Sequence, residues 1–480
     1  MEQHYRTRAV VVPLDPSPSQ EQLLRSYCGA ARFAYNWTIT TVQENLALRA
    51  RERTDDVAEA DLTKLSWHAF ALTPLWNASK DGVAPWHRDV TMHAFRSGVT
   101  NAANALKNFN ESKKGKRRGL LVGFPKRKNR HSKLSVTFTD IGLQSGWFSV
   151  DSRHIRLILP RNATDPRITR HRSQLQWLHT TESLRRLKTK VVSREWSIQS
   201  MTISFTGGRW QAAFSVRQPL ITSEVNRHVR PLVGVDLGVK HLATLSVPVS
   251  GVSDKHGHVT NPRLLDRELD RLACLNRQLA RSVKGSKNRA KILKRRQLLY
   301  GRVTRTRALY LHRITTTLAE RFETVVLEDL HVVGMVNSKT PTTSATARLV
   351  LDASFYELRR QLTYKTTDRG HRVIAVNRFY PSSKKCSHCG ETKAKLARGE
   401  RIFECSNCGV SLDRDVNAAR NIHAEGQRLI ANEVLNVAGH EPETLNADSR
   451  SHKTRAHTCE GRDRYESRTT QPFSELSLSV

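Results

Sequence analysis

The chain has 480 residues, a net charge of +35 and only 38% apolar residues. This length exceeds the size at which a single hydrophobic core stops growing, so two or three domains are expected. No uncharged run of about 18 residues appears, which argues against a membrane span, and the N-terminus lacks a secretory signal. We therefore expect a soluble, cytosolic protein.

The positive charge is concentrated in two blocks of the sequence. Residues 113–130 contain nine Lys and Arg and no acid, and residues 271–313 contain fourteen and no acid. Such blocks are typical of surfaces that contact phosphate backbones. A solvated face or a solubility tail is the alternative, but it does not account for the clustering. A nucleic acid is the expected partner.

The N-terminal stretch predicts a strand followed by a helix. Residues 6–15, RTRAVVVPLD, have the β-branched pattern of a strand. Ser17, Pro18 and Gln20 then match an N-cap, an N1 proline and the third position of a capping box. Helices are expected to continue to about residue 110, with breaks at Pro74 and Pro85.

Short β-branched and aromatic runs follow between residues 113 and 218 and predict a small β-barrel. The runs expected to be strands are LSVTFTD, GWFSVD, HIRLILP, QSMTISFTG and RWQAAFSVR. The barrel is thus interrupted in sequence by the preceding helical region. All eight tryptophans precede residue 231, which indicates a domain boundary near Arg230.

Strands and helices alternate after residue 230 and predict an α/β domain. LVGVDLG and HLATLSV have the pattern of a hairpin, and TVVLEDL and RVIAVN that of two further strands. A long basic helix is expected before TVVLEDL, and DVNAARNIHAEG is expected to begin another helix. Residues after about 440 are polar and unpatterned, which predicts a disordered tail.

Four of the seven cysteines predict a metal site. Cys386, Cys389, Cys405 and Cys408 have the spacing C-x2-C-x15-C-x2-C. Two such pairs close a tetrahedral shell around Zn²⁺ and leave no open position, so the zinc would be structural. Gly390 and Gly409 follow the second cysteine of each pair, where the turn needs a permissive backbone.

Three carboxylates predict a second metal site, with a catalytic role. Asp236 and Glu328 end predicted strands, and Asp415 opens a predicted helix. Carboxylates at strand ends and a helix start can converge on one sheet edge, where their repulsion favours divalent cations. Two Mg²⁺ ions at such a site would support phosphodiester hydrolysis.

Each acid also has a simpler interpretation. Asp236 could hydrate a turn, Asp415 could cap its helix, and Glu328 could pair with an arginine. Asp413 and Asp329 are equally acidic neighbours, and spacing does not choose between them. The GVDLG segment also suits a phosphate loop of an actin-like or sugar-kinase-like ATPase. That interpretation requires a second glycine-rich loop and an adenosine motif, neither of which is present.

The sequence closely resembles the TnpB proteins, which are transposon-encoded RNA-guided DNA endonucleases related to compact type V CRISPR effectors. The segments that carry the resemblance are GVDLGVKHLATLS, VVLEDLHVVGM, FYPSSKKCSHCG and LDRDVNAARNI. Weaker support comes from RFAYNW, FPKRK and RQLARSVKGSKNRAKI. The resemblance extends from about residue 6 to about residue 437.

The resemblance implies roles for the acids and the cysteines. It assigns the three RuvC acids to Asp236, Glu328 and Asp415, and the family's zinc-binding insertion to the four paired cysteines. It also implies that guide RNA and target double-stranded DNA are the partners, and that the protein is cytoplasmic, in a prokaryotic cytosol or nucleoid. The protein would read a short target-adjacent motif, while guide–target pairing reads the sequence.

The resulting architecture is multidomain α+β, with an RNase H-like (RuvC) nuclease domain and an N-terminal wedge-like β-barrel. The expected parts are a barrel at 1–15 and 111–230, a helical recognition lobe at 16–110, a nuclease domain at 231–383 and 411–437, a zinc ribbon at 384–410 and a tail at 438–480.

The predicted function is RNA-guided, Mg²⁺-dependent cleavage of DNA by a monomer on its RNA. The alternatives are a compact CRISPR effector of the same ancestry, a repressor that binds without cutting, and a transposase that joins strands. The side chains expected to contact nucleic-acid backbones are Lys126, Arg127, Lys128, Lys294, Arg295 and Arg296.

Overall fold

The structure is a computed structural model that describes residues 5–117, 120–139, 148, 151–219, 229–336, 341–397 and 399–438. The described residues fall into two units, which are divided in the sequence after Arg428. The predicted tail lies outside the described residues from 439 onward. None of the described helices has the length and apolar character needed to cross a bilayer.

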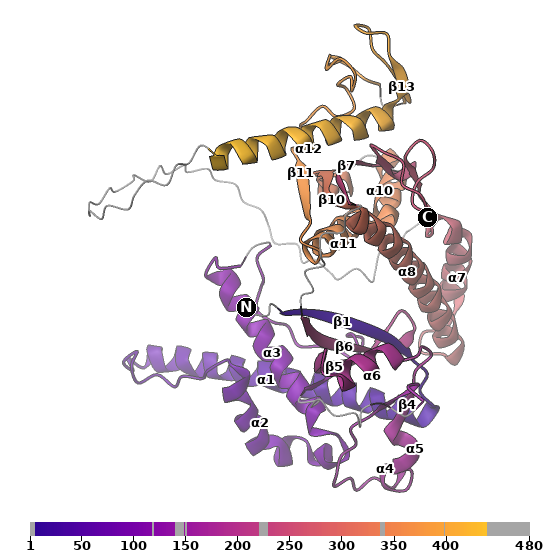
Figure 1. The fold of residues 1–480 in the computed structure, drawn as a ribbon. Helices are drawn as coiled ribbons and strands as arrows, with labels where there is room; N and C mark the ends of the chain where they lie inside the picture. The colour runs from indigo at the N-terminus through magenta and orange to yellow at the C-terminus, as the bar shows by residue number, and fades with distance from the viewer. Residues whose placement is uncertain are drawn as a thin grey trace. The chain divides into compact units, whose positions relative to one another are not determined.

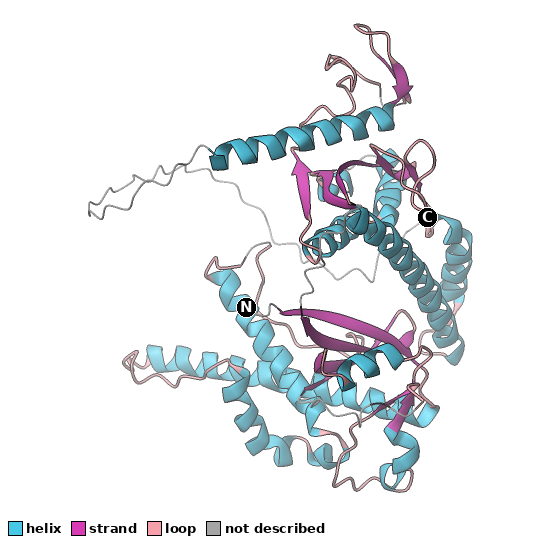
Figure 2. Ribbon diagram, in the orientation of Figure 1, coloured by secondary structure: helices cyan, strands magenta, loops and turns pink. Residues whose placement is uncertain are grey.

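The N-terminal half contains an antiparallel sheet of four described strands, which are drawn among the strands of Figure 2. Its strands are β1 (Tyr5–Leu14), β6 (Arg209–Pro219), β5 (Ser197–Thr206) and β2 (Ser135–Thr139), in that order. The short strands β3 (His154–Arg156) and β4 (Trp177–His179) form a separate pair. No closed sheet is seen among the described residues, so closure into the expected barrel stays a prediction. Most of GWFSVD lies outside the described residues.

The helices of this half are α1 (Pro18–Thr54), α2 (Ala69–Val83), η1 (Pro85–Asp89) and α3 (Met92–Lys113), followed by α4 (Pro166–Thr169), α5 (Arg172–Gln176) and α6 (Arg185–Val192). The predicted capping box is confirmed at the start of α1. Ser17 Oγ accepts from the Gln20 amide at 3.4 Å, and Gln20 Oε1 accepts from the Ser17 amide at 3.0 Å. The helices and the sheet share one hydrophobic core.

The predicted break at Pro74 is wrong, because Pro74 lies inside α2. A proline removes the hydrogen bond to the carbonyl four residues earlier, which here belongs to Phe70. Phe70 is 97% exposed. Water can therefore satisfy the freed carbonyl, and the helix continues. The predicted break at Pro85 is confirmed, because α2 ends at Val83 and Pro85 begins the short 3₁₀ helix η1.

The C-terminal half is built on a five-stranded sheet of order β11-β10-β7-β8-β9. The predicted hairpin is confirmed, since β7 (Arg230–Leu237) pairs antiparallel with β8 (His241–Leu245), which pairs with β9 (His258–Thr260). The predicted strands β10 (Phe322–Glu328) and β11 (Arg372–Val376) are confirmed too, and both run parallel to β7. The sheet therefore mixes parallel and antiparallel strands, and the domain around it is of the α/β type.

Helices cover both faces of this sheet (Figure 1). Val233, Val235, Val325 and Leu327 share one core with residues of α8 and α11. The alternate residues Gly234 and Val326 contact α12 on the other face. The helices of this half are η3 (Asp266–Glu268), α7 (Leu269–Arg281), α8 (Lys287–Arg321), α9 (Val332–Val336), α10 (Pro341–Ala353), α11 (Phe355–Thr367) and α12 (Arg414–Ala438). The small strands β12 (Ile402–Glu404) and β13 (Ser411–Asp413) precede α12.

Candidate active site and metal centre

The sheet places Asp236 and Glu328 side by side. Strands β7 and β10 are parallel, and the last pair in their register is Val235 with Leu327. The next residue on each strand is Asp236 and Glu328, so the two acids follow at the same level. Neighbouring strands lie about 4.8 Å apart. The two carboxylates therefore share one edge of the sheet.

The same two acids point to the face that α12 covers. Side chains alternate along a strand, so Asp236 lies on the face of Gly234, and Glu328 on the face of Val326. A Cβ on Gly234 would lie 2.3 Å from the Ala419 carbonyl oxygen, so only glycine lets α12 approach β7 this closely. The sequence of β7 thus brings the start of α12 to the acidic edge.

Asp415 is the second residue of α12, and its carboxylate does not cap that helix. Asp413 Oδ1 accepts from the backbone amides of Asp415 at 2.9 Å and Val416 at 3.1 Å. Asp413 is therefore the N-cap. The Asp415 carboxylate is instead 3.1 Å from the guanidinium of Arg414, beside the other two acids.

The neighbours Glu328 and Asp329 have different partners. Asp329 pairs with Arg359 at 2.8 Å and with Arg378 at 2.6 Å, and these hydrogen bonds lower its pKa. Glu328 accepts a hydrogen bond from the Ser382 hydroxyl. Asp329 is thus neutralised by arginines, whereas no cationic side chain of the described residues forms an ion pair with Glu328.

The three acids repel one another across the site. Burial raises the pKa of Asp236 well above its ordinary value, and the charges of Glu328 and Asp415 raise it further, against the opposing effect of Arg414. Burial also raises the pKa of Glu328. Carboxylates held in such proximity favour a bound divalent cation. Their hard oxygen atoms suit Mg²⁺, so the donor set fits the predicted ion.

The four predicted cysteines come together as a metal-binding group. Their Sγ atoms all lie within 4.8 Å of one another, and in the described part of the chain no other group of His, Cys, Asp or Glu meets this spacing, the three acids included. Both turns have positive-φ glycines, Gly390 at +82° and Gly409 at +69°, as predicted. The cluster could hold a zinc ion in a closed thiolate shell.

The two halves of this cysteine cluster, called the ribbon below, have matching backbone hydrogen bonds. Cys386 donates its amide to the Glu391 carbonyl at 2.7 Å, and Cys405 donates to the Val410 carbonyl at 2.9 Å. Hydrogen bonds from the Glu391 backbone amide and from Asn407 lower the pKa of Cys389, whereas, against a hydrogen bond from the Val410 backbone amide, burial and the other three thiols raise the pKa of Cys408. A lowered pKa favours the thiolate form, which is the form that binds metal.

Two buried asparagines, which the sequence reasoning missed, fasten the ribbon to α12. Asn417 donates to the Lys385 carbonyl at 2.7 Å and accepts from the Ser387 amide at 2.8 Å. Asn421, one turn later, donates to the carbonyls of Ser382 at 2.8 Å and Lys385 at 2.6 Å. The signal for these contacts in the sequence is the DVNAARN segment, where the two asparagines are four residues apart and so lie on one face of the helix. Asparagines that are buried on such a face need hydrogen-bond partners.

A histidine near the acids was also missed. His241 begins β8 at the acidic edge, and its ring stacks on that of His258 with centroids 4.2 Å apart. Burial and the neighbouring His258 and Lys240 lower the pKa of His241, whereas Asp415 and Asp413 act against this shift. The acids are therefore close enough to influence this ring.

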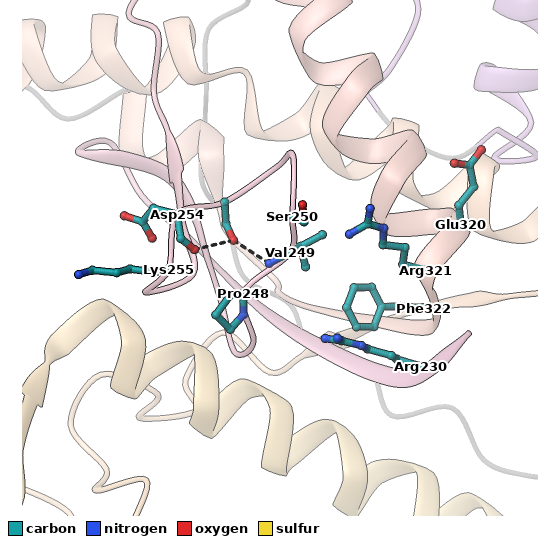
Figure 3. Close-up of a pocket in the computed structure, with 10 residues that line it drawn as sticks. Arg230, Pro248, Val249, Ser250, Asp254, Lys255, Glu320, Arg321 and Phe322 are labelled. Carbon is teal, nitrogen blue, oxygen red and sulfur yellow. Dashed lines mark hydrogen bonds between the residues drawn. The ribbon is translucent and has the colours of Figure 1, made fainter. Parts of the chain in front are cut away.

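A separate pocket lies at the opposite end of the same sheet (Figure 3). Its volume is about 750 Å³, and Arg230 and Phe322, the first residues of β7 and β10, line it. Ser253 closes one side with hydrogen bonds to the Val249 amide and the Asp254 carbonyl. The acids lie at the last residues of these strands, so this pocket is not their site.

The basic residues predicted to contact nucleic acid differ in their surroundings. Lys126, Arg127, Lys294 and Arg295 are exposed. Lys128 is half-buried, with its Nζ 3.9 Å from the centre of the Tyr35 ring. Arg296 is also half-buried and donates to Asn276 at 3.3 Å.

The two weaker motifs of the N-terminal half contact each other. Asn36 of RFAYNW exchanges two hydrogen bonds with the backbone of Lys128 in FPKRK, at 2.7 and 2.8 Å. Arg32 donates to the Asn129 carbonyl at 3.4 Å. The basic loop that contains FPKRK is therefore anchored to α1. This contact could not be predicted, because the two motifs are far apart in the sequence.

Comparison with known proteins gives three family matches. Residues 216–339 match a family described as a probable transposase, and residues 355–422 match the TNB domain of Cas12f1-like proteins. Residues 1–51 match a helix-turn-helix domain, although here they contain β1 and a single continuous helix through Thr54.

Individual relatives cover most of the chain. Proteins named "Putative RNA-guided DNA endonuclease" are 30% identical in Mycobacterium tuberculosis, over 85% of this chain and 84% of the relative, and in Escherichia coli, over 89% and 94%. A CRISPR-associated endodeoxyribonuclease Cas12f1 of Sulfoacidibacillus thermotolerans is 27% identical over 40% of this chain and 44% of the relative.

A solved structure shares the fold. The Cas12f1 chain in a complex with guide RNA and target DNA superimposes with a TM-score of 0.52 at 14% identity, covering 87% of this chain and 99% of that one. The fold and the site define an α/β protein with three clustered acids at one sheet edge and a four-cysteine cluster that could hold a metal ion. The chain belongs to the TnpB family of RNA-guided DNA endonucleases.

Proposed function

We propose that this chain cuts target DNA under the direction of a bound guide RNA, by Mg²⁺-dependent phosphodiester hydrolysis at Asp236, Glu328 and Asp415. The observation that carries the proposal is the convergence of these acids at one sheet edge, where burial and like charges raise the pKa of Asp236. Family membership supports the activity. The two relatives named above that match most of the chain are bacterial, which supports a prokaryotic cytosol as its compartment.

The three acids would hold two Mg²⁺ ions. When bound, these ions lower the pKa of the attacking water and stabilise charge on the leaving 3′-oxygen. Asp236 and Glu328 supply oxygen ligands from adjacent strands, and Asp415 supplies one from the start of α12. Arg414 balances the charge of Asp415 in the metal-free chain. The products would have 5′-phosphate and 3′-hydroxyl ends.

The rest of the chain would deliver the substrate to this edge. The region from residue 231 would form the RNase H-like (RuvC) domain, with residues 384–410 as its zinc ribbon. The N-terminal sheet, at 1–15 and 111–230, would act as a wedge-like barrel, and the helices at 16–110 as a recognition lobe. Guide RNA, target double-stranded DNA and a short adjacent motif are the proposed partners, bound by a monomer.

The first test is expression together with flanking genomic DNA, followed by sequencing of the RNA that copurifies. The purified particle is then given Mg²⁺ and plasmids that match the guide segment of that RNA. We expect cutting only of matched plasmids. Full cutting by Asp236→Ala would refute the assignment of the site.

Two acids separated by one residue provide a matched pair of variants. Asp415→Asn should abolish cutting, because a neutral amide cannot hold the cation. Asp413→Asn should keep most of it, since asparagine is an equally good N-cap. The opposite result would transfer the metal-binding role to Asp413. Guided binding without cutting by the wild type would favour the repressor alternative.

A further inference from the structure

An exposed aromatic side chain stands next to the acidic edge. Phe379 is 86% exposed, and its neighbours Asn377 and Arg378 are exposed as well. Single exposed apolar residues are common on protein surfaces and need no explanation by themselves. The position and the support of Phe379 are what distinguish it.

Phe379 lies in a short loop, and residues at both ends of this loop contact Glu328. Val376, three residues before Phe379, pairs with Glu328 across β11 and β10. Ser382, three residues after Phe379, donates its hydroxyl to the Glu328 carboxylate. Three residues span at most about 10 Å. Phe379 therefore lies within the length of a few nucleotides from a proposed metal ligand.

Hydrogen bonds hold the loop in one shape. Asn377 Oδ1 accepts from the Phe379 amide at 2.9 Å, and the Asn377 carbonyl accepts from the Tyr380 amide at 2.9 Å. The Tyr380 hydroxyl donates to the Asn421 carbonyl on α12 at 3.3 Å. Arg378 pairs with Asp329. The ring of Phe379 is thus presented to solvent by a structured turn.

We propose that Phe379 stacks on an unpaired base of the DNA strand being cut, within a few nucleotides of the scissile phosphate. An aromatic face binds any base, which suits a nuclease that must cut whatever sequence its guide selects. A flat ring on a rigid loop loses little freedom on binding, and stacking would hold the strand while the acids act. This inference rests on the proposed function.

The test uses the full chain with its copurified RNA and a matched target DNA. Each strand of this DNA in turn carries 2-aminopurine at successive positions around the cut, and Ca²⁺ replaces Mg²⁺ so that DNA binds without being cut. We expect the fluorescence to be quenched at one or two positions in the wild type and in Phe379→Trp, and restored in Phe379→Ala. With Mg²⁺, Phe379→Ala should cut about tenfold or more slowly.

Tyr356→Ala is the matched control, because Tyr356 is also an aromatic residue that is mostly exposed, at 73%, but lies on α11, which packs on the face of the sheet opposite to the acids. It should keep both the quenching and the cutting rate. Phe379→Leu, apolar but not aromatic, should behave like Phe379→Ala.

Three results would overturn the inference. In the first, Phe379→Ala cuts within twofold of the wild type with an unchanged quenching pattern. In the second, size-exclusion chromatography shows a dimer that Phe379→Ala dissociates, which would mean that a second copy covers the ring. In the third, the wild type itself cuts no matched DNA, and the proposed function then fails together with this inference.

Discussion

Asp236 occupies a position in which the folded chain disfavours its charge. Burial is the largest cause, followed by Glu328 and Asp415, and all three raise its pKa. The neutral acid is therefore the form that the metal-free fold prefers. The contribution of protonated Asp236 to the stability of the fold is complete below the ordinary pKa of 3.8. It is lost as the pH rises through the raised pKa of the folded chain. Near neutral pH, the metal-free fold is destabilised by this site.

Asp236→Asn should consequently raise the melting temperature of the metal-free chain while abolishing cutting. The amide has a similar shape and stays neutral, so it removes the repulsion that the carboxylate experiences. We expect a gain of roughly 2–4 °C, the shift that corresponds to about 1 kcal/mol. The measurement is thermal melting in EDTA from pH 5 to pH 8, with the gain growing as the pH rises.

Mg²⁺ provides the control for this prediction. The ion should raise the melting temperature of the wild type more than that of the variant, because it neutralises the same repulsion. A variant that melts below the wild type at every pH would show that the Asp236 carboxylate makes a net stabilising contact.

The choice between adjacent acids shows how far sequence alone reaches at this scale. Both Glu328 and Asp329 follow a predicted strand, and the strand itself was correctly predicted. What separates them are the arginine partners of Asp329, which lie 30 and 49 residues further along the chain. No local pattern contains such contacts, so the preference for Glu328 depended on a family resemblance.

At the scale of elements, local rules were reliable where the partners are near in sequence. The capping box at Ser17 involves a residue three positions away, and each cysteine turn closes on its own glycine. The helix through Pro74 could not be predicted, because its tolerance depends on the solvent exposure of Phe70. The close packing of α12 on β7 also escaped prediction, since Gly234 and Ala419 are far apart in sequence.

Gly234→Ala tests how this packing positions the site. The added Cβ would lie 2.3 Å from the Ala419 carbonyl oxygen and 2.5 Å from the His423 amide nitrogen, both backbone atoms. The start of α12 must then shift, and Asp415 with it. We expect a loss of about 1–3 kcal/mol in the free energy of unfolding and at least a tenfold loss of guided cutting, measured by denaturant unfolding and by plasmid cleavage.

Gly29→Ala is the control for this substitution. Gly29 lies within α1, and a Cβ added there would meet no neighbouring atom within 4 Å. This change should stabilise the chain by about 0.5–1 kcal/mol, because alanine favours the helix, and it should leave cutting intact. Equal effects of the two variants would mean that α12 can move without consequence for the site.

At the scale of the whole molecule, the net charge of +35 dominates. An excess of this size repels itself in a compact chain unless a polyanion neutralises it. Each phosphate contact releases counterions, so the number of contacts can be read from the salt dependence of binding. The salt dependence of RNA binding therefore distinguishes basic residues that contact the phosphate backbone from basic residues that do not.

Lys126→Gln and Lys128→Gln should separate these two groups within one basic loop. Lys126 is exposed, whereas Lys128 is half-buried against Tyr35, and burial lowers its pKa. The slope of log affinity against log salt for the guide RNA should fall by about one for Lys126→Gln. It should be unchanged for Lys128→Gln, which should instead lower the melting temperature through loss of the contact with the ring. A slope that falls equally in both variants would place Lys128 on the RNA, so that its packing on α1 would have to be released when the RNA binds.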